Sequence, residues 1–262
     1  MILRLFLSIT LILTLPSRSQ WGDYNTEKIL SHVSAIVLAD FQSSSNENGY
    51  QVGIFKITEI LKGRRPKVGE EIHLWGYDDL VVGPVVKFEE LKKSSHLLLI
   101  YYLGRAPDGK RLITGSPANG TSSVLPITNG KVPWPREFIH NAKEFPTDLD
   151  KVKKQISVVA KAEADAYAKG VAKAKSELKK GELNYNFQTN IYTQAADAFF
   201  VSKAKKKYGI TVRIQTHTLY DAVDREEHEG FNDTIIAHLK KKLGYNPIPK
   251  LRGFGLRHLN DK

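Results

Sequence analysis

Residues 50–63 have the sequence YQVGIFKITEILKG, and this stretch decides the fold of the first half of the chain. β-branched and aromatic residues dominate it, and apolar and polar side chains alternate at its centre, as in a strand with one buried face. A basic turn at 64–67 separates it from a shorter apolar run at 72–75. The stretch therefore predicts a long strand, a turn and a second strand.

Further short runs surround this pair. Strands are expected at 33–41, 96–103 and 112–114, with a polar loop at 43–49 and a hairpin around Asn129-Gly130, a dipeptide typical of tight hairpin turns. The 96–103 run is the most apolar of the chain after its N-terminal segment, which predicts a strand buried on both faces. Five or more strands with no convincing helix predict an all-β unit over 28–134. Closure into a barrel would remove its exposed edges.

The run Phe55-Lys56-Ile57-Thr58-Glu59-Ile60-Leu61-Lys62-Gly63, followed by Val68-Gly69-Glu70-Glu71-Ile72, resembles the second and third strands of netrin-like, metalloproteinase-inhibitor-like OB-fold domains. The resemblance covers the N-terminal half only. It implies an OB-like barrel that binds ligands on the face of these two strands and on neighbouring loops. The animal inhibitors use an N-terminal cysteine and disulfides. This chain has no cysteine, so protease inhibition by that route is not implied.

The resemblance places candidate ligand-binding residues on this face and its connecting turn. They are Arg64, Arg65, His73, Trp75 and Tyr77, with Lys56 as a further exposed position. Aromatic rings beside cations suit stacking against a sugar or a base. The alternative for Trp75 is a place in the core.

The hydrophobic period changes after a proline-containing connector at 135–146. Helical spacing of apolar residues predicts a helix from Thr147, as its N-cap, to Lys180, and a last helix over 219–243 that buries Val223, Phe231, Ile235 and Leu239. A strand at 183–188, a helix at 193–208 and a strand at 210–215 form a predicted βαβ unit with parallel strands. The second half is thus expected to be a small α/β domain over 147–246 followed by a basic tail at 247–262. The whole chain is then α+β.

Charge is concentrated in this second half. Residues 146–262 carry 22 Lys/Arg against 14 Asp/Glu, a net of +8, out of +11 for the whole chain. The runs Lys203–Lys207, Lys240–Lys242 and Arg252–Arg257 predict one cationic patch if two helix ends and the tail meet, the central residues being Lys205, Lys206, Lys207, Lys240, Lys241 and Lys242. Such a patch would bind polyanions in a salt-dependent manner. The alternative is ordinary stabilisation of helix C-termini by cations.

The N-terminal segment predicts export. Arg4, an apolar run from Leu5 to Leu15, Pro16 and small residues up to Ser19 match a secretory signal cleaved after Ser19. The alternative is an uncleaved anchor, and no later segment has the 18 apolar residues that a membrane-spanning helix needs. A secreted, periplasmic or envelope location follows. There the expected partner is an acidic envelope glycan, an anionic lipid surface or a protein, and nucleic acid is not expected.

Catalytic motifs are weak. Nucleophile elbows, phosphate-binding glycine loops and the His-Glu-x-x-His pattern are absent from the sequence. Asp221, Asp224 and His228 recur three and four apart within the His217–His238 region, which leaves a metal-dependent hydrolase as the alternative function. An exposed polar helix face explains the same spacing. Asn119 and Asn232 begin glycosylation sequons, which matter only in a eukaryotic host. The sequence therefore favours a non-enzymatic binding or structural protein without a cofactor.

Overall fold

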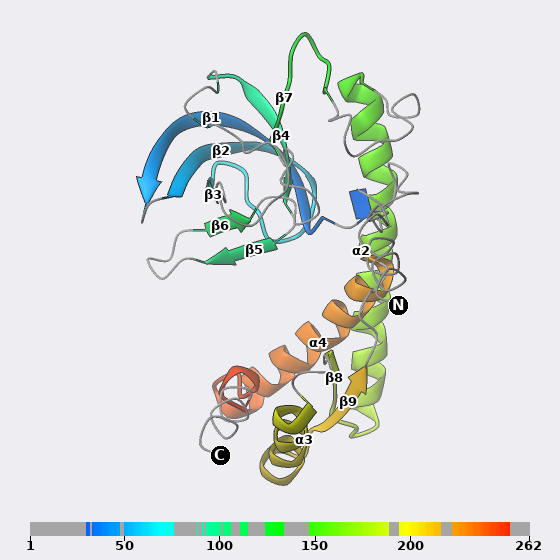
Figure 1. Cartoon of the computed structure of the whole chain (residues 1–262). Coiled ribbons are helices and arrows are strands. Elements are labelled where there is room, and N and C mark those ends of the chain that lie inside the picture. The colour runs from blue at the N-terminus through cyan, green and yellow to red at the C-terminus, as the bar shows by residue number, and fades with distance from the viewer. Residues whose placement is uncertain are drawn as a thin grey trace, which may run out of the picture. The chain divides into compact units, whose positions relative to one another are not determined.

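The computed structural model describes residues 30–31, 33–47, 50–75, 88, 91, 93–100, 102–105, 111–114, 124–133, 147–188, 194–215 and 222–251. The chain forms two compact units, one ending at Gln155 and one beginning at Ile156. Strands dominate the first unit, and helices with a two-stranded sheet make up the second (Figure 1). The predicted α+β class is confirmed. The expected signal at 1–19 and the connector at 135–146 lie outside the described residues.

A hairpin of two 13-residue strands organises the first unit. β1 (Ala35–Glu47) and β2 (Tyr50–Lys62) pair antiparallel, from Ile36 opposite Lys62 to Glu47 opposite Tyr50. The polar loop predicted at 43–49 is therefore wrong, because residues 43–47 continue β1. Side chains 42–44 and 46 are exposed, and the main-chain ladder needs no apolar side chains at this end of the hairpin.

Five shorter strands complete the sheet: β3 (Glu71–Trp75), β4 (Ser95–Ile100), β5 (Tyr102–Arg105), β6 (Arg111–Thr114) and β7 (Val124–Pro126). Their order is β5-β6-β3-β2-β1-β4-β7, and only β3 and β6 are parallel neighbours. The single strand predicted at 96–103 is divided, since β4 pairs with β1 and β7 whereas β5 pairs with β6. In this order the sheet is open, and the predicted closed barrel is not confirmed.

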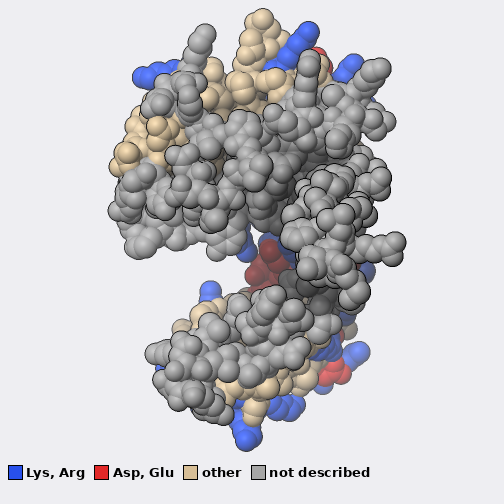
Figure 2. Space-filling model, in the orientation of Figure 1, with Lys and Arg blue, Asp and Glu red and all other residues tan. Residues whose placement is uncertain are grey.

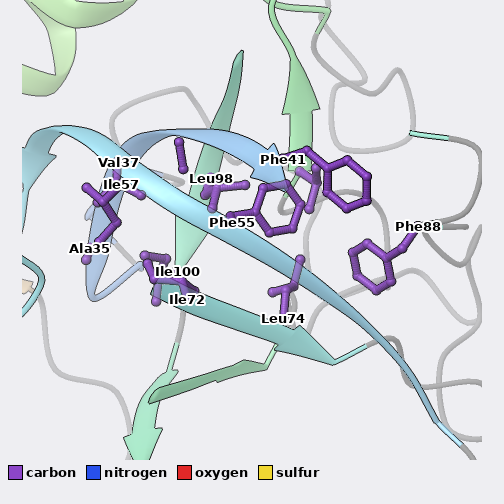
Figure 3. Close-up of a cluster of buried hydrophobic side chains, with 12 residues drawn as sticks. Ala35, Val37, Phe41, Phe55, Ile57, Ile72, Leu74, Phe88, Leu98 and Ile100 are labelled. Carbon is purple, nitrogen blue, oxygen red and sulfur yellow. The ribbon is translucent and has the colours of Figure 1, made fainter. Parts of the chain in front are cut away.

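The core of this unit lies against one face of the curved sheet (Figure 3). Alternate residues of the strands supply it, namely Ala35, Val37, Ala39, Phe41, Phe55, Ile57, Ile72, Leu74, Leu98 and Ile100. Ring centroids lie 5.3 Å apart for Phe41 and Phe55 and 6.2 Å apart for Phe55 and Phe88. These tilted and edge-to-face contacts add favourable ring electrostatics to the burial of apolar area.

The opposite face of the central strands is buried too, including Ile36, Leu38, Leu97 and Leu99. The start of α2 (Leu149–Lys179) is tied to this unit. Val132 N donates to Thr147 O at 2.7 Å, and Lys153 Nζ donates to Glu59 Oε2 at 2.6 Å. Burial on both faces of β4 confirms the prediction from its continuous apolar run.

A buried lysine fixes the segment before β1. Lys62, at the end of β2, is 2% exposed, and its Nζ donates to the main-chain oxygens of Leu30 and Val33, each at 2.6 Å. Ser31 O lies at 3.4 Å from the same atom. Carbonyl oxygens thus replace water around a charge that would be costly to bury unpaired.

The second unit continues α2 and adds β8 (Asn184–Gln188), α3 (Gln194–Tyr208), β9 (Thr211–Gln215) and α4 (Ala222–Leu243). β8 and β9 are parallel, with Asn184 opposite Thr211 and Gln188 opposite Gln215, which confirms the predicted βαβ unit. Their core includes Ala174, Phe187, Phe200, Ala204, Ile210, Val212, Phe231, Ile235 and Leu239.

Two details of these helices differ from the sequence predictions. Asp148 rather than Thr147 caps α2, because Asp148 Oδ1 accepts from Lys151 N at 3.1 Å, whereas Thr147 offers its main-chain oxygen to Val132 N. Val223 is 38% exposed and does not face the core. The burial predicted for Phe231, Ile235 and Leu239 is confirmed.

Two glycines allow α2 and α4 to cross with their backbones in near contact (Figure 1). A Cβ placed on Gly170 would lie 1.9 Å from Glu227 O, and one on Gly230 would lie 2.2 Å from Tyr167 O. Neither position has room for a methyl group. The alanine-rich half of α2, with Ala166 and Ala174 buried, therefore packs on α4 through small residues.

Asn232 of α4 completes the edge of β8. Its Oδ1 accepts from Asn186 N at 2.9 Å, and its Nδ2 donates to Asn186 O at 2.8 Å, as a neighbouring strand would. Both polar atoms of the Asn232 side chain are therefore engaged with the main chain of β8. The sequon at Asn119 lies outside the described residues.

None of the helices in the described part of the chain combines the length and the apolar character needed to cross a bilayer.

The helix crossing generates a test in which steric contact and helix propensity act in opposite directions. Gly170→Ala should lower the free energy of unfolding by about 1–3 kcal/mol, because the added methyl forces α2 and α4 apart. Helix propensity alone would raise it by roughly 1 kcal/mol. Urea unfolding followed by circular dichroism measures the change. Ala168→Gly, at an exposed position of the same helix, is the control and should follow propensity. A Gly170→Ala protein as stable as the parent would contradict the crossing.

Candidate anion-binding surface

The C-termini of α3 and α4 meet in the second unit. Each helix ends before a glycine with positive φ, Gly209 at 70° and Gly244 at 76°. Gly209 N donates to Lys205 O at 3.0 Å, and Gly244 N donates to Lys240 O at 2.8 Å, which closes the last turns. Tyr208 and Tyr245 beside these glycines share a hydrogen bond between their hydroxyls at 3.0 Å. The two helix ends are therefore held together.

The C-terminus of α2 lies at the same end of the unit. Leu183 O, just after that helix, accepts from Thr211 N at 2.8 Å, and Thr211 Oγ1 in turn accepts from Lys205 Nζ at 3.0 Å. Three helix ends thus converge, and lysines occupy all of them. We name these exposed residues the lysine surface: Lys179, Lys180, Lys205, Lys206, Lys207, Lys240, Lys241, Lys242 and, from the segment after α4, Lys250. Figure 2 shows lysine and arginine side chains along the lower rim of this unit.

The position of these cations has a local cause. The last carbonyls of each helix lack intrahelical partners and carry partial negative charge, which favours lysine there. Stabilisation of one helix end explains one basic last turn. It does not explain why three lysine-bearing helix ends lie together, because their lysines repel one another unless an anion or salt screens the charges. The structure therefore brings together both lysine triplets of the predicted patch. Arg252 to Arg257 lie outside the described residues.

Neighbouring lysine charges act on the hydroxyl of Tyr208 in the tyrosine pair. The hydrogen bond to Tyr245 lowers the pKa of Tyr208, and the charges of Lys207 and Lys250 lower it further. The same hydrogen bond raises the pKa of Tyr245. Lys207 Nζ lies 5.4 Å from the centroid of the Tyr208 ring, a cation–π distance.

A carboxylate near the end of α2 is already bound within the protein. Burial tends to raise the pKa of Glu177, but hydrogen bonds from Asn184 and Arg213 outweigh it and leave that pKa lowered. The contacts are 2.8 Å from Asn184 Nδ2 and 2.9 Å from Arg213 Nη1. Glu177 is thus ionised and paired with Arg213.

The ligand face predicted for the N-terminal unit is only partly assembled. Arg64 and Arg65 are exposed on the turn between β2 and β3, and Lys56 is exposed on β2 with Asp40 and Glu71 opposite it on the neighbouring strands. His73, expected at the surface, is 3% exposed, because β3 is buried on both faces at this point. The side chain of Trp75 and the whole of Tyr77 lie outside the described residues.

His96 is a second buried histidine among the described residues of this unit. Its Nδ1 lies 2.7 Å from Ser94 O, and its ring lies 5.7 Å from the centroid of Phe55. Burial lowers the pKa of His96 and outweighs the opposing effects of the hydrogen bond to Ser94 and the charge of Asp40. His96 is therefore a neutral core residue.

The structure describes two of the three residues of the alternative metal site. Asp224 is exposed and His228 is half-buried on α4, while Asp221 lies outside the described residues. Burial lowers the pKa of His228 against the opposing charges of Asp224 and Glu227. Glu227 Oε2 accepts from Lys169 Nζ at 2.7 Å, so a lysine already occupies the place beside it. Across the described ranges, no three His, Asp or Glu side chains are gathered closely enough to hold a metal ion.

Sequence reasoning missed three members of the lysine surface, Lys179, Lys180 and Lys250, and the two tyrosines beside it, Tyr208 and Tyr245. Gly181 follows Lys179 and Lys180 directly, and this pattern could have identified them. Gly209 and Gly244 follow the two lysine triplets in a similar way. The tyrosines carried no signal, because only the fold brings positions 208 and 245 within hydrogen-bond distance.

Comparison of the chain with models of known protein families finds no match, and comparison with curated proteins finds none either. Its function is therefore inferred from its own residues.

The burial of His96 predicts a pH dependence of stability. The unfolded chain binds a proton at the ordinary histidine pKa of about 6.5, whereas folded His96 does so only at lower pH. The free energy of unfolding should therefore fall as the pH drops below about 6.5. His96→Gln should lose less stability than the parent between about pH 7.5 and about pH 5.5 in urea unfolding.

His238→Gln, at an exposed position of α4, is the matched control for replacing one histidine by glutamine. His228 also has a lowered pKa, so part of the slope remains in both variants. An unchanged slope in His96→Gln would show that burial does not lower the pKa of this ring in the folded protein.

Proposed function

We propose that this chain is an exported, non-enzymatic protein of the cell envelope or extracellular space that binds an anionic partner through the lysine surface. The observation that carries the proposal is the convergence of three lysine-bearing helix ends, two of them joined by the Tyr208–Tyr245 hydrogen bond. A preassembled cluster of cations attracts a polyanion over a Debye length and holds it by several weak contacts at once.

Export is part of this proposal. It is supported by the basic and apolar N-terminal residues, Arg4 followed by Leu5 to Leu15, and by small residues before Gln20. In that location acidic envelope glycans, anionic lipid headgroups and acidic proteins are the accessible polyanions. Edman sequencing of the mature protein beginning at Gln20 would support cleavage after Ser19, and a retained Met1 would contradict it.

We further propose that the N-terminal unit is an OB-like barrel of the netrin-like type. In support, β5 follows β4 after a single residue, β4 pairs with β1, and β5 pairs with β6. If β4 and β5 act as one bent strand, the path β1-β2-β3-β6-β5/β4 returns to β1, which is the circuit that a small barrel requires. Such a barrel would present Arg64 and Arg65 at the edge of its ligand face.

Removal of one lysine triplet tests the binding site. The triple variant Lys240→Gln, Lys241→Gln and Lys242→Gln should elute from immobilised heparin at lower salt and bind about tenfold more weakly, because three exposed charge contacts are lost. If the parent binds vesicles of anionic lipid, the same variant should bind them more weakly. Binding of the parent should decline as salt rises.

The control removes the same charge elsewhere on a helix. Lys151, Lys154 and Lys161 are exposed on the first half of α2, and their change to Gln should leave binding within about twofold. Equal losses in both triple variants would show that net charge alone drives binding. A parent protein that binds neither heparin nor vesicles would contradict the proposed function.

A further inference from the structure

An exposed aromatic ring lies within the lysine surface. Tyr245 is 45% exposed although its hydroxyl is bonded to that of Tyr208. Gly244 precedes it at the end of α4, and after it Asn246 Oδ1 accepts from Ile248 N at 3.1 Å while Ile248 is buried. The backbone on both sides of the ring is therefore fixed. A ligand that covers it need not pay the cost of ordering a loose side chain.

The tyrosine pair also retains hydrogen-bonding capacity. Two hydroxyls carry two protons, and the hydrogen bond between them uses one, so one O–H donor remains for a ligand. Lys207 lies over the Tyr208 ring, and the charge of Lys250 also acts on that hydroxyl. The pair thus offers an aromatic face, a neutral donor and flanking ammonium groups in one place.

This combination favours a sugar polymer over a membrane. Surfaces that enter lipid carry several exposed aliphatic or aromatic side chains beside their cations. Of the large hydrophobic side chains exposed in the described ranges, only Tyr245 directly follows a helix end that carries part of the lysine surface. Ile214 lies near the opposite end of β9, and Val223 lies in the first turn of α4. A pyranose ring matches a single flat aromatic face, and its carboxylates or sulfates match the lysines.

We propose that the lysine surface recognises an acidic polysaccharide, with a sugar ring stacked on Tyr245 and an acidic group held beside the Tyr208 hydroxyl by Lys207 and Lys250. This inference rests on the proposed function and deepens it from polyanion binding to glycan binding. Lysine charge supplies long-range attraction common to all polyanions, and the tyrosine pair supplies the contact that requires a sugar.

The test compares a polyanion that contains sugar rings with one that does not. Isothermal titration of the full chain with polygalacturonate and with poly-glutamate measures both affinities at the same salt concentration. Tyr245→Ala should weaken polygalacturonate binding about tenfold and leave poly-glutamate binding within about twofold, since only the stacking contact is lost. Tyr245→Phe keeps the ring and should retain most of the affinity. Ile214→Ala, which shortens another exposed apolar side chain of the same unit, should change neither.

Poly-glutamate binding also reports that the lysine surface of each variant is intact, so misfolding cannot imitate the expected result. Equal losses for both polymers in Tyr245→Ala, or no loss for either, would overturn the glycan inference while leaving polyanion binding in place. Tyr245-dependent binding to phosphatidylglycerol vesicles with no Tyr245 effect on polygalacturonate would overturn it in favour of a membrane. Failure of the parent to bind any of these probes would instead remove the proposed function.

Discussion

The near contact of the α2 and α4 backbones is the constraint on which the second unit depends. It requires two glycines, because Gly170 lies against the backbone of Glu227 and Gly230 lies against the backbone of Tyr167. Both helices run in the same general direction (Figure 1), so their C-termini lie toward the same end of the unit. Because the βαβ connection places the C-terminus of α3 there as well, the crossing determines that three partially negative helix ends converge and that their lysines form one surface.

The chain has no cysteine, so polar contacts rather than disulfides fix the positions of its segments. Lys62 binds the segment before β1 through main-chain oxygens, and Asn232 pairs with both polar groups of Asn186. In each case one side chain hydrogen-bonds to main-chain polar groups. Any other arrangement of that segment would leave these groups without hydrogen-bond partners. Such contacts contribute modest net stability but exclude other arrangements, because breaking them costs the full desolvation of the remaining group.

Stability and binding are linked in the lysine surface. Lysine in the last turn of a helix is favourable by itself, so no one triplet indicates a partner. Placing the triplets together adds mutual repulsion, and under the proposed function a bound polyanion would relieve it and stabilise the protein. Tyr208 and Tyr245 hold two of these ends at fixed separation and give the surface a feature that bulk charge lacks.

The sequence by itself determined the local elements. Side-chain period and backbone chemistry within a few residues account for them. The examples are the alternation at the centre of 50–62, the apolar run at 97–100, the Asn129-Gly130 turn and the helix ends before Gly181, Gly209 and Gly244. Only the tertiary structure decided which of these elements touch. Contacts between residues far apart in the chain account for the features that local patterns missed. These are the division of the 96–103 run, the burial of His73, the pairing of Asn232 with β8 and the hydrogen bond between Tyr208 and Tyr245. No local pattern encodes such contacts, because their energy exists only once the partner is in place.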